Sequence, residues 1–259
     1  MKKNYILECC VDSVESAMAA AKGGADRLEL CAALVIGGTS PGIALFEQVR
    51  NICDLPVRVL LRPRFGDFLY TEHEFAVIKR ETELFKEAGA DGVVIGCLTP
   101  DGDLNMTQMS ELIKTAGSLK ITLHRAFDVC ADPIKAYRQA SELGIDTILT
   151  SGQEKDCLTG MPLLNELCKL QKQIDGPQIM AGAGVNPEVI RQFLADTEIT
   201  SYHLSAKKII DSGMLYRKEG VPMGLPAMSE YDIYRTDRAI VAEAKSVLMA
   251  HQAAGAAAP

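Results

Sequence analysis

The sequence lacks three features that define common protein classes. No Cys-x-x-Cys pair occurs among its eight cysteines, which are spread from Cys9 to Cys168, so zinc ribbons and thioredoxin-type chemistry are disfavoured. No apolar run approaches the roughly 18 residues of a membrane span, and the stretch at Ile6 is too short for a signal peptide. The net charge of −7 argues against broad contact with nucleic acid. We therefore expect a cytoplasmic protein with free thiols, no membrane contact and no nucleic-acid partner.

The composition is that of a folded chain. The 259 residues are 47% hydrophobic and 24% charged, which excludes disordered, collagen-like and coiled-coil classes. No segment resembles a linker, so we predict a single domain over residues 1–259.

A short pattern recurs along the chain, in which a helical stretch ends in glycine, a small or apolar residue and aspartate, followed by an apolar run. It occurs at Gly24–Asp26, Gly89–Asp91 and Gly144–Asp146. Glycine just past a helix end provides a left-handed C-cap, and the apolar run is typical of a buried parallel strand. The pattern indicates repeated βα units.

Eight strands are expected, separated by helical patterns such as 74–88 and 132–143. The expected strands cover about 5–10, 26–31, 57–62, 92–97, 119–124, 146–151, 177–182 and 201–205. This alternation favours the α/β class and a closed (β/α)8 TIM barrel. An open doubly wound sheet is the alternative, but it would require a dinucleotide-binding fingerprint after the first strand, where Cys10–Ser13 stands instead.

The predicted barrel occupies about 5–205 and is followed by a C-terminal extension and helix over 206–251 and a frayed tail over 252–259. Ser229 is expected to open the last helix, with Asp232 as its capping partner.

The extension also contains apolar residues that suggest packing or an oligomer interface rather than soft metal ligands. They are Met214, Met223, Leu225 and Met228.

Two expected strands end in a glutamate and a cysteine two positions apart. With a period of two, Glu8 shares a face with Cys10, and Glu29 shares a face with Cys31. A carboxylate is not expected to face the apolar helix layer, so both pairs should point into the barrel mouth. Neighbouring strands lie about 4.8 Å apart, which allows the two cysteines to approach each other. The alternative is a pair of buried thiols in small-residue positions.

Other strand ends carry basic or hydroxyl side chains, and these could meet the two glutamates in one cavity. Glu8, Glu29 and His124 are candidates for general acid or base. Asp67 and Asp128 are expected to cap turns or pair with arginines. A self-neutralising layer of ion pairs is the alternative, although burying so many charges without a ligand is costly.

Two glycine-containing loops follow the sixth and seventh strands, and the second ends in Asn186-Pro187, typical of a helix start. Barrels often bind phosphate at such loops. The candidate anion-binding residues are Arg62, Arg64, Ser151, Gly182, Gly184, His203 and Ser205.

Several of these motifs together resemble the copper homeostasis protein CutC family, along nearly the whole chain. They are Glu8-Cys9-Cys10, Gly24–Cys31, Gly37–Pro41, Arg62–Phe68, Thr122–Asp128, Ile148–Gly152, Met180–Val185 and the segment around His203 and Ser205. The departures are Phe65, where glycine is expected, and Leu123, where phenylalanine is usual.

The resemblance implies a cytoplasmic TIM barrel that forms a homo-oligomer, a dimer or a tetramer, and that binds Cu(I) through Cys10 and Cys31. Soft thiolates do select Cu(I). The alternative is an enzyme that acts on a small anionic or phosphorylated metabolite held by Arg62, Arg64 and the Gly182–Gly184 loop.

Overall fold

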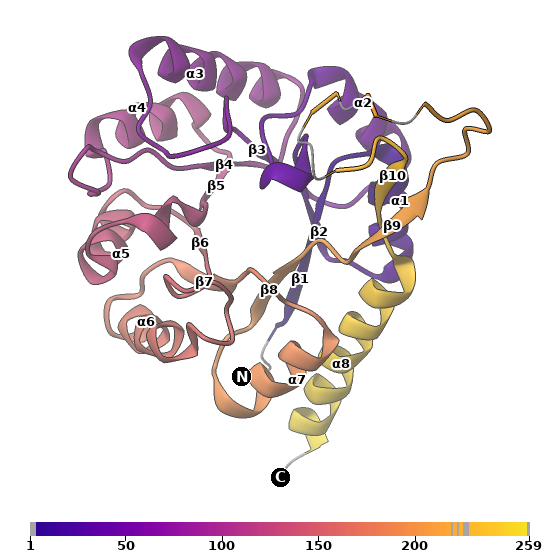
Figure 1. Cartoon of the computed structure of the whole chain (residues 1–259). Helices are drawn as coiled ribbons and strands as arrows, with labels where there is room; N and C mark the ends of the chain where they lie inside the picture. Colours follow the sequence, from indigo (N-terminus) through magenta and orange to yellow (C-terminus); the bar gives the residue numbers. More distant parts are fainter. Residues whose placement is uncertain (1–3, 219, 222, 225–227, 258–259) are drawn as a thin grey trace.

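The computed structural model describes residues 4–218, 220–221, 223–224 and 228–257. Eight parallel strands close into a barrel in the order β1 to β8 (Figure 1). They are β1 (Ile6–Val11), β2 (Arg27–Leu30), β3 (Val57–Leu60), β4 (Gly92–Ile95), β5 (Lys120–Leu123), β6 (Thr147–Thr150), β7 (Gln178–Ala181) and β8 (Ser201–Leu204). The predicted (β/α)8 barrel is confirmed, and no open sheet edge is left in it.

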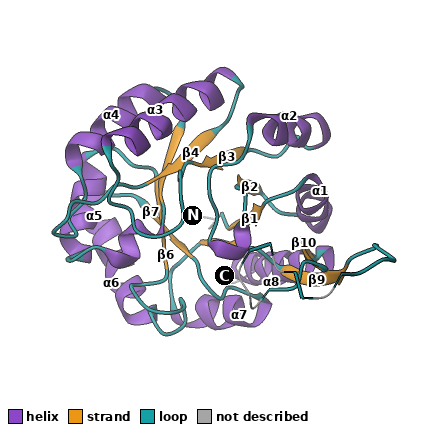
Figure 2. Cartoon of the chain, turned by 45° about the horizontal axis from the view of Figure 1, so that its top comes forward, coloured by secondary structure: helices purple, strands orange, loops and turns teal. Residues whose placement is uncertain are grey.

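Helices surround the ring of strands on the outside (Figure 2). They are α1 (Val14–Gly23), α2 (Ile43–Ile52), α3 (Glu72–Glu87), α4 (Met106–Ala116), α5 (Pro133–Glu142), α6 (Met161–Ile174) and α7 (Pro187–Asp196). Their ends follow local chemistry, because Asp132 and Asn186 accept hydrogen bonds from the first amides of α5 and α7. Gly24, at φ 89°, is the left-handed cap of α1.

Most strands end one or two residues earlier than the apolar pattern predicts. Strand β3 ends at Leu60. Beyond it, the carbonyl of Arg62 accepts a hydrogen bond from the amide of Ser40 in a loop and not from a neighbouring strand. Pro63, which follows, has no amide hydrogen to donate to a sheet. Several predicted site residues, among them Arg62 and His124, therefore lie in the loops just after the strands.

The C-terminal extension differs from the prediction. Residues 229–237 do not begin a helix; β9 (Lys207–Asp211) and β10 (Asp232–Thr236) form an antiparallel hairpin beside the barrel (Figure 1). Ser229 and Asp232 therefore do not cap the last helix. That role falls to Asp237, whose Oδ1 accepts a hydrogen bond of 2.8 Å from the amide of Ala239.

The last helix, α8 (Arg238–Ala257), begins and ends later than expected. It includes nearly all of the segment predicted to be frayed, because alanine has the highest helix propensity. Figure 1 shows α8 beside α1 and α7. Val241, Ala244 and Leu248 are fully buried. A Cβ atom at Gly23 would lie 2.6 Å from Cβ of Val241, so α1 approaches α8 this closely only with glycine there.

The segment between β9 and β10 carries exposed apolar side chains. Met214 and Met223 are exposed and so do not pack against the rest of this chain, and their predicted place in an oligomer interface stays a prediction. Leu225 lies outside the described residues. In the part of the chain that the structure describes, no helix has both the length and the apolarity to cross a membrane.

Candidate functional site

The barrel interior contains a buried charged cluster on β1, β2 and β8. The register of these strands sets Glu8 opposite both Arg27 and His203. One carboxylate oxygen of Glu8 accepts a hydrogen bond from Nε of Arg27, and the other lies 2.8 Å from Nδ1 of His203. Burial alone would raise the pKa of Glu8, but Arg27 and His203 outweigh it and lower the pKa to about 2. Glu8 is therefore a fully buried carboxylate that orients the side chains of Arg27 and His203.

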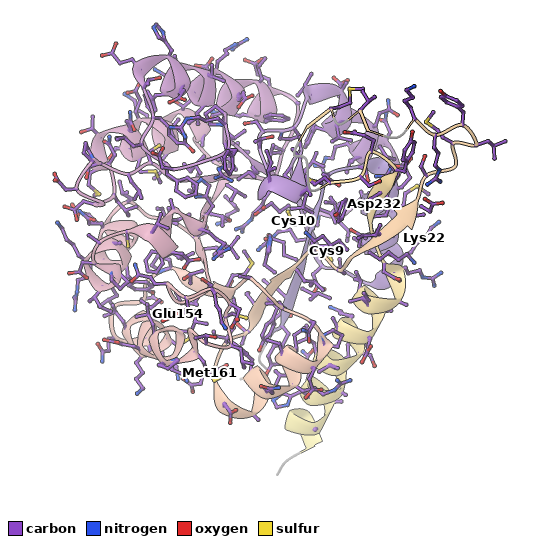
Figure 3. All side chains as sticks on the ribbon, viewed as in Figure 1. Cys9, Cys10, Lys22, Glu154, Met161 and Asp232 are labelled. Carbon is purple, nitrogen blue, oxygen red and sulfur yellow. The ribbon has the colours of Figure 1, made fainter. Side chains whose placement is uncertain are left out.

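The predicted pairing of the two cysteines is confirmed. Sγ of Cys10 lies 3.6 Å from Sγ of Cys31, and both thiols are almost completely buried beside Leu60 and Val94. The hydrogen bond to Cys31, together with burial, raises the pKa of Cys10 well above its ordinary value. The adjacent Cys9 points instead into the core outside the barrel. Figure 3 labels both residues on the β1 side of the barrel.

Glu29 lies next to this pair. Sγ of Cys10 donates to Oε1 of Glu29 at 3.4 Å, whereas Oε2 is buried and has no hydrogen-bond partner among the described residues. Burial raises the pKa of Glu29. One donor atom each from Cys10, Glu29 and His203 lies within 4.8 Å of the others, and these three residues form a group that could hold a metal ion.

His124 follows β5 and faces the same barrel mouth from the opposite side. Its Nδ1 accepts a hydrogen bond of 3.1 Å from the amide of Ala126, whereas its Nε2 is buried without a partner in the described chain. Burial, reinforced by the charge of Arg62, lowers the pKa of His124 to about 3. The ring is therefore neutral with its proton on Nε2. A Cβ atom at Gly96 would lie 2.6 Å from this ring, so glycine makes room for it.

The two predicted anion-binding arginines have different surroundings. Arg62 stacks on Phe68 at 4.9 Å and donates to the carbonyls of Gly37, Gly38 and Gly66. Its Nε is buried and unpartnered, and no carboxylate of the described residues lies within ion-pair distance.

Arg64, in contrast, is ion-paired with Asp67 and Glu74. The predicted role of Asp67 as an arginine partner is confirmed. Arg64 and Arg62 therefore do not share a face toward the mouth, because they lie beyond the regular alternation of β3.

A cavity of about 360 Å³ opens at this end of the barrel. Its described lining includes Cys10, Glu29, Arg62, His124 and His203 from the predicted set, and not Arg64. The remaining lining residues are Leu34, Ile36, Gly37, Leu60, Phe65, Phe68, Arg125, Asp128, Val129 and Leu149.

The glycine loops do not contribute to the described cavity lining. Asn186 already accepts hydrogen bonds from the amides of Glu188 and Val189, so the first amides of α7 are engaged. The hydroxyl of Ser151, which is fully buried, donates to the carbonyl of Glu154. The carbonyl of Ser205 accepts a hydrogen bond from the hydroxyl of Thr236 on β10. Phosphate binding by Gly182, Gly184 and Ser205 gains no support from these contacts.

Asp128 belongs with these loop contacts. As predicted for an aspartate that pairs with an arginine and caps a turn, it forms an ion pair with Arg125 and accepts a hydrogen bond from the amide of Ser151.

Sequence reasoning missed two buried arginines of the barrel interior. Arg27 neutralises Glu8, and Arg58 donates to the hydroxyls of Thr122 and Thr147. A signal was available, because Arg27 precedes Glu29 by two positions and so faces the same side of the strand. Both arginines lie within the strands rather than at the strand ends, where the chemistry of a barrel usually gathers.

Comparison with known proteins places these features in a family. The family model described as "CutC family" matches residues 5–208. The chain belongs to the CutC family. CutC family proteins from Salmonella schwarzengrund and Salmonella typhimurium are each 42% identical to it over 249 residues, which cover 96% of this chain and 99% of theirs. The suspected resemblance is thus confirmed, and the family carries the name of copper homeostasis.

Solved structures show the same fold. The structure named for the copper homeostasis protein CutC of Streptococcus agalactiae superposes with a TM-score of 0.73 at 24% identity, over 78% of this chain and 98% of that one. A thiamine phosphate pyrophosphorylase from Pyrococcus furiosus superposes with a TM-score of 0.56 at 15% identity, over 96% of this chain and 98% of that one. At these identities the likeness concerns the barrel fold.

Proposed function

We propose that this CutC family protein binds Cu(I) as cargo through the thiolates of Cys10 and Cys31, with His203 as a third donor. The observation that carries the proposal is the 3.6 Å separation of the two Sγ atoms beside the mouth cavity. A metal–thiolate bond is about 2.3 Å long in proteins, so a single ion can contact both sulfur atoms at this separation.

The donor set suits a soft monovalent metal. Thiolates select Cu(I), whereas carboxylates suit harder ions, so Glu29 is the weaker donor of the neighbouring group. Nδ1 of His203 is engaged by Glu8, which leaves Nε2 for a metal. A carboxylate that holds the second nitrogen of a histidine is the usual support of a metal-binding imidazole. Glu8, which is paired with Arg27, therefore orients the imidazole of His203 for metal binding.

The surroundings also tolerate the charge of the complex. Two thiolates and one Cu(I) carry a net charge of −1, and Arg27 and Arg62 lie on the same side of the barrel, at the interior and mouth. Access is provided by the cavity, since Cys10 is part of its lining. Binding must release thiol protons, because the thiolate is the metal ligand.

The test is a Cu(I) competition titration against a chromogenic chelator under anaerobic, reducing conditions. We expect one Cu(I) per chain for the wild type and its loss in the Cys10→Ser/Cys31→Ser double variant. The matched control is Cys53→Ser, since Cys53 is also buried but lies at the end of α2. Stoichiometric binding that persists in the double variant, with an unchanged melting temperature, would refute the thiolate site.

A further inference from the structure

The mouth cavity contains two hydrogen-bond donors that no described residue uses. Nε2 of His124 and Nε of Arg62 are both buried without a partner, and both residues line the cavity. His124 is only 4% exposed. A buried donor without an acceptor costs about 1–3 kcal/mol, so two such donors in one cavity wall indicate an acceptor supplied from outside the chain.

The protonation of the histidine is set by the backbone. The amide of Ala126 donates to Nδ1 of His124, so the lone pair of that nitrogen is in use and the proton resides on Nε2. The lowered pKa of His124 agrees with this neutral donor form. The ring of His124 is packed between the backbone at Gly96 and the ring of Phe68, whose centroid lies 4.7 Å away. His124 therefore presents a rigid N–H donor.

Arg62 adds a positive charge that the described residues do not neutralise. Its other nitrogens bind backbone carbonyls of the loops after β2 and β3. These three contacts fix the guanidinium plane over Phe68 and leave Nε–H for a ligand. The same cavity has apolar walls from Leu34, Leu60 and Leu149. The Arg125–Asp128 ion pair and Glu29 also line the cavity, but that pair is neutralised within itself and burial raises the pKa of Glu29. An anionic acceptor on a small apolar body therefore fits the unpaired charge of Arg62, the two donors and the apolar surface.

We propose that the mouth cavity binds a small organic carboxylate, whose oxygens accept hydrogen bonds from Nε2 of His124 and Nε of Arg62. A carboxylate matches two donors and one charge. A phosphate would require more donors, and the first amides of α7 are already bound to Asn186. Cys10 lines the same cavity, but the two donors are not among the proposed copper ligands, so metal-free protein is the appropriate sample.

The test is calorimetric titration of metal-free protein with benzoate, with benzamide as the uncharged probe of the same shape. We expect benzoate to bind with a Kd of about 1 mM or tighter and benzamide at least about tenfold more weakly, because a hydrogen bond to a charged group is lost. Inorganic phosphate is titrated in parallel. Absence of benzoate binding, or binding of phosphate in its place, would overturn the proposal.

Two substitutions of His124 separate its donor from its structural role. His124→Gln retains a donor near the Nε2 position, whereas His124→Asn retains an acceptor near Nδ1 for Ala126 and removes that donor. We expect benzoate affinity to fall about tenfold in the asparagine variant and to stay within about threefold of wild type in the glutamine variant. The reverse order would contradict the assignment of Nε2 as the donor.

The arginine provides a second pair. Arg62→Gln should weaken benzoate binding at least about tenfold, whereas Arg64→Gln should leave it unchanged, because Arg64 is paired with Asp67 and Glu74 away from the cavity. Melting temperatures show whether Arg62→Gln remains folded. Should it unfold, the two His124 variants decide the question alone. Equal effects of both arginine substitutions would refute a local contact with the ligand.

Discussion

Glu8 and His203 lie 195 positions apart in the chain, and Oε1 of Glu8 is 2.8 Å from Nδ1 of His203. Closure of the barrel produces this contact, because β1 pairs with β8 and sets these two residues side by side. The other oxygen of Glu8 binds Arg27 on β2. One carboxylate thus connects the first strand to both of its neighbours and orients the histidine that faces the thiol pair.

Replacement of Glu8 by glutamine should lower the free energy of unfolding by about 3–5 kcal/mol, because buried Arg27 loses its counter-charge. Urea denaturation at neutral pH measures this. The control is Glu142→Gln on the exposed surface of α5, for which we expect a change within about 0.5 kcal/mol. Equal losses in the two variants would show that the buried ion pair does not stabilise the fold.

The same carboxylate predicts a dependence of stability on acid. The pKa of Glu8 falls from 4.5 to about 2 on folding, so its contribution is complete above about pH 4.5 and is lost as the pH falls toward 2. The stability difference between wild type and Glu8→Gln should therefore shrink over this interval. A constant difference between pH 5 and pH 3, measured by denaturation of both proteins, would contradict the lowered pKa.

The pKa values of the two histidines of the mouth should be shifted in opposite directions. For His203, the charges of Glu29 and Glu8 outweigh burial and raise the pKa above 6.5; its stabilising contribution is complete below that value and is lost as the pH rises through the raised pKa. His124, with a pKa of about 3, should stay neutral. Nitrogen-15 NMR of the imidazoles between pH 5 and 8 distinguishes them. A protonated His124 at pH 5 would disprove this assignment.

Copper affinity should increase with pH. The thiol of Cys10 has a raised pKa and must lose its proton to bind metal, so the apparent affinity should rise by about tenfold per pH unit for each thiol proton that binding releases. Competition titrations at three pH values measure the slope after correction for the chelator. A flat profile would mean that Cys10 does not bind copper as a thiolate.

Close packing of α8 on the barrel is expected to depend on Gly23. Gly23→Ala should destabilise the protein by about 1–3 kcal/mol, because its methyl group would overlap Val241. Gly255→Ala is the matched control, since a Cβ atom there meets nothing within 4 Å. Combining Gly23→Ala with Val241→Gly should remove most of the steric part of the loss, because the nearest atom to the added methyl group is Cβ of Val241. If the double variant shows the full sum of both single losses in denaturation experiments, steric overlap is not the cause.

Much of the fold was readable from local sequence, because βα units are defined by short-range signals. The Gly–x–Asp pattern, the caps at Asp132 and Asn186, and the apolar runs indicate the strands and helices within about two residues. The hairpin was missed, because exposed strands such as β9 bury few residues and depend on pairing with a distant partner. The helix in the tail was missed because chain ends commonly fray, whereas the alanine content of this tail favours a helix.

The candidate site was likewise predictable where it depends on local sequence and not where it depends on contacts between distant residues. The period of two placed Cys10 and Cys31 on the mouth side of their strands, and their family motifs were already recognisable. The partner of each charge could not be predicted, because Arg27, Glu8 and His203 meet through the closure of the barrel.

For this protein, the sequence by itself determined the order of the strands and which strand faces carry thiols and carboxylates, since both depend on local periodicity. Only the tertiary structure decided the rest. It placed Arg62 and Arg64 in different surroundings and paired Glu8 with both Arg27 and His203. It also left Nε2 of His124 as an unpartnered donor in a cavity. Those outcomes depend on distances and burial between residues far apart in the chain, and these are fixed when the eighth strand pairs with the first.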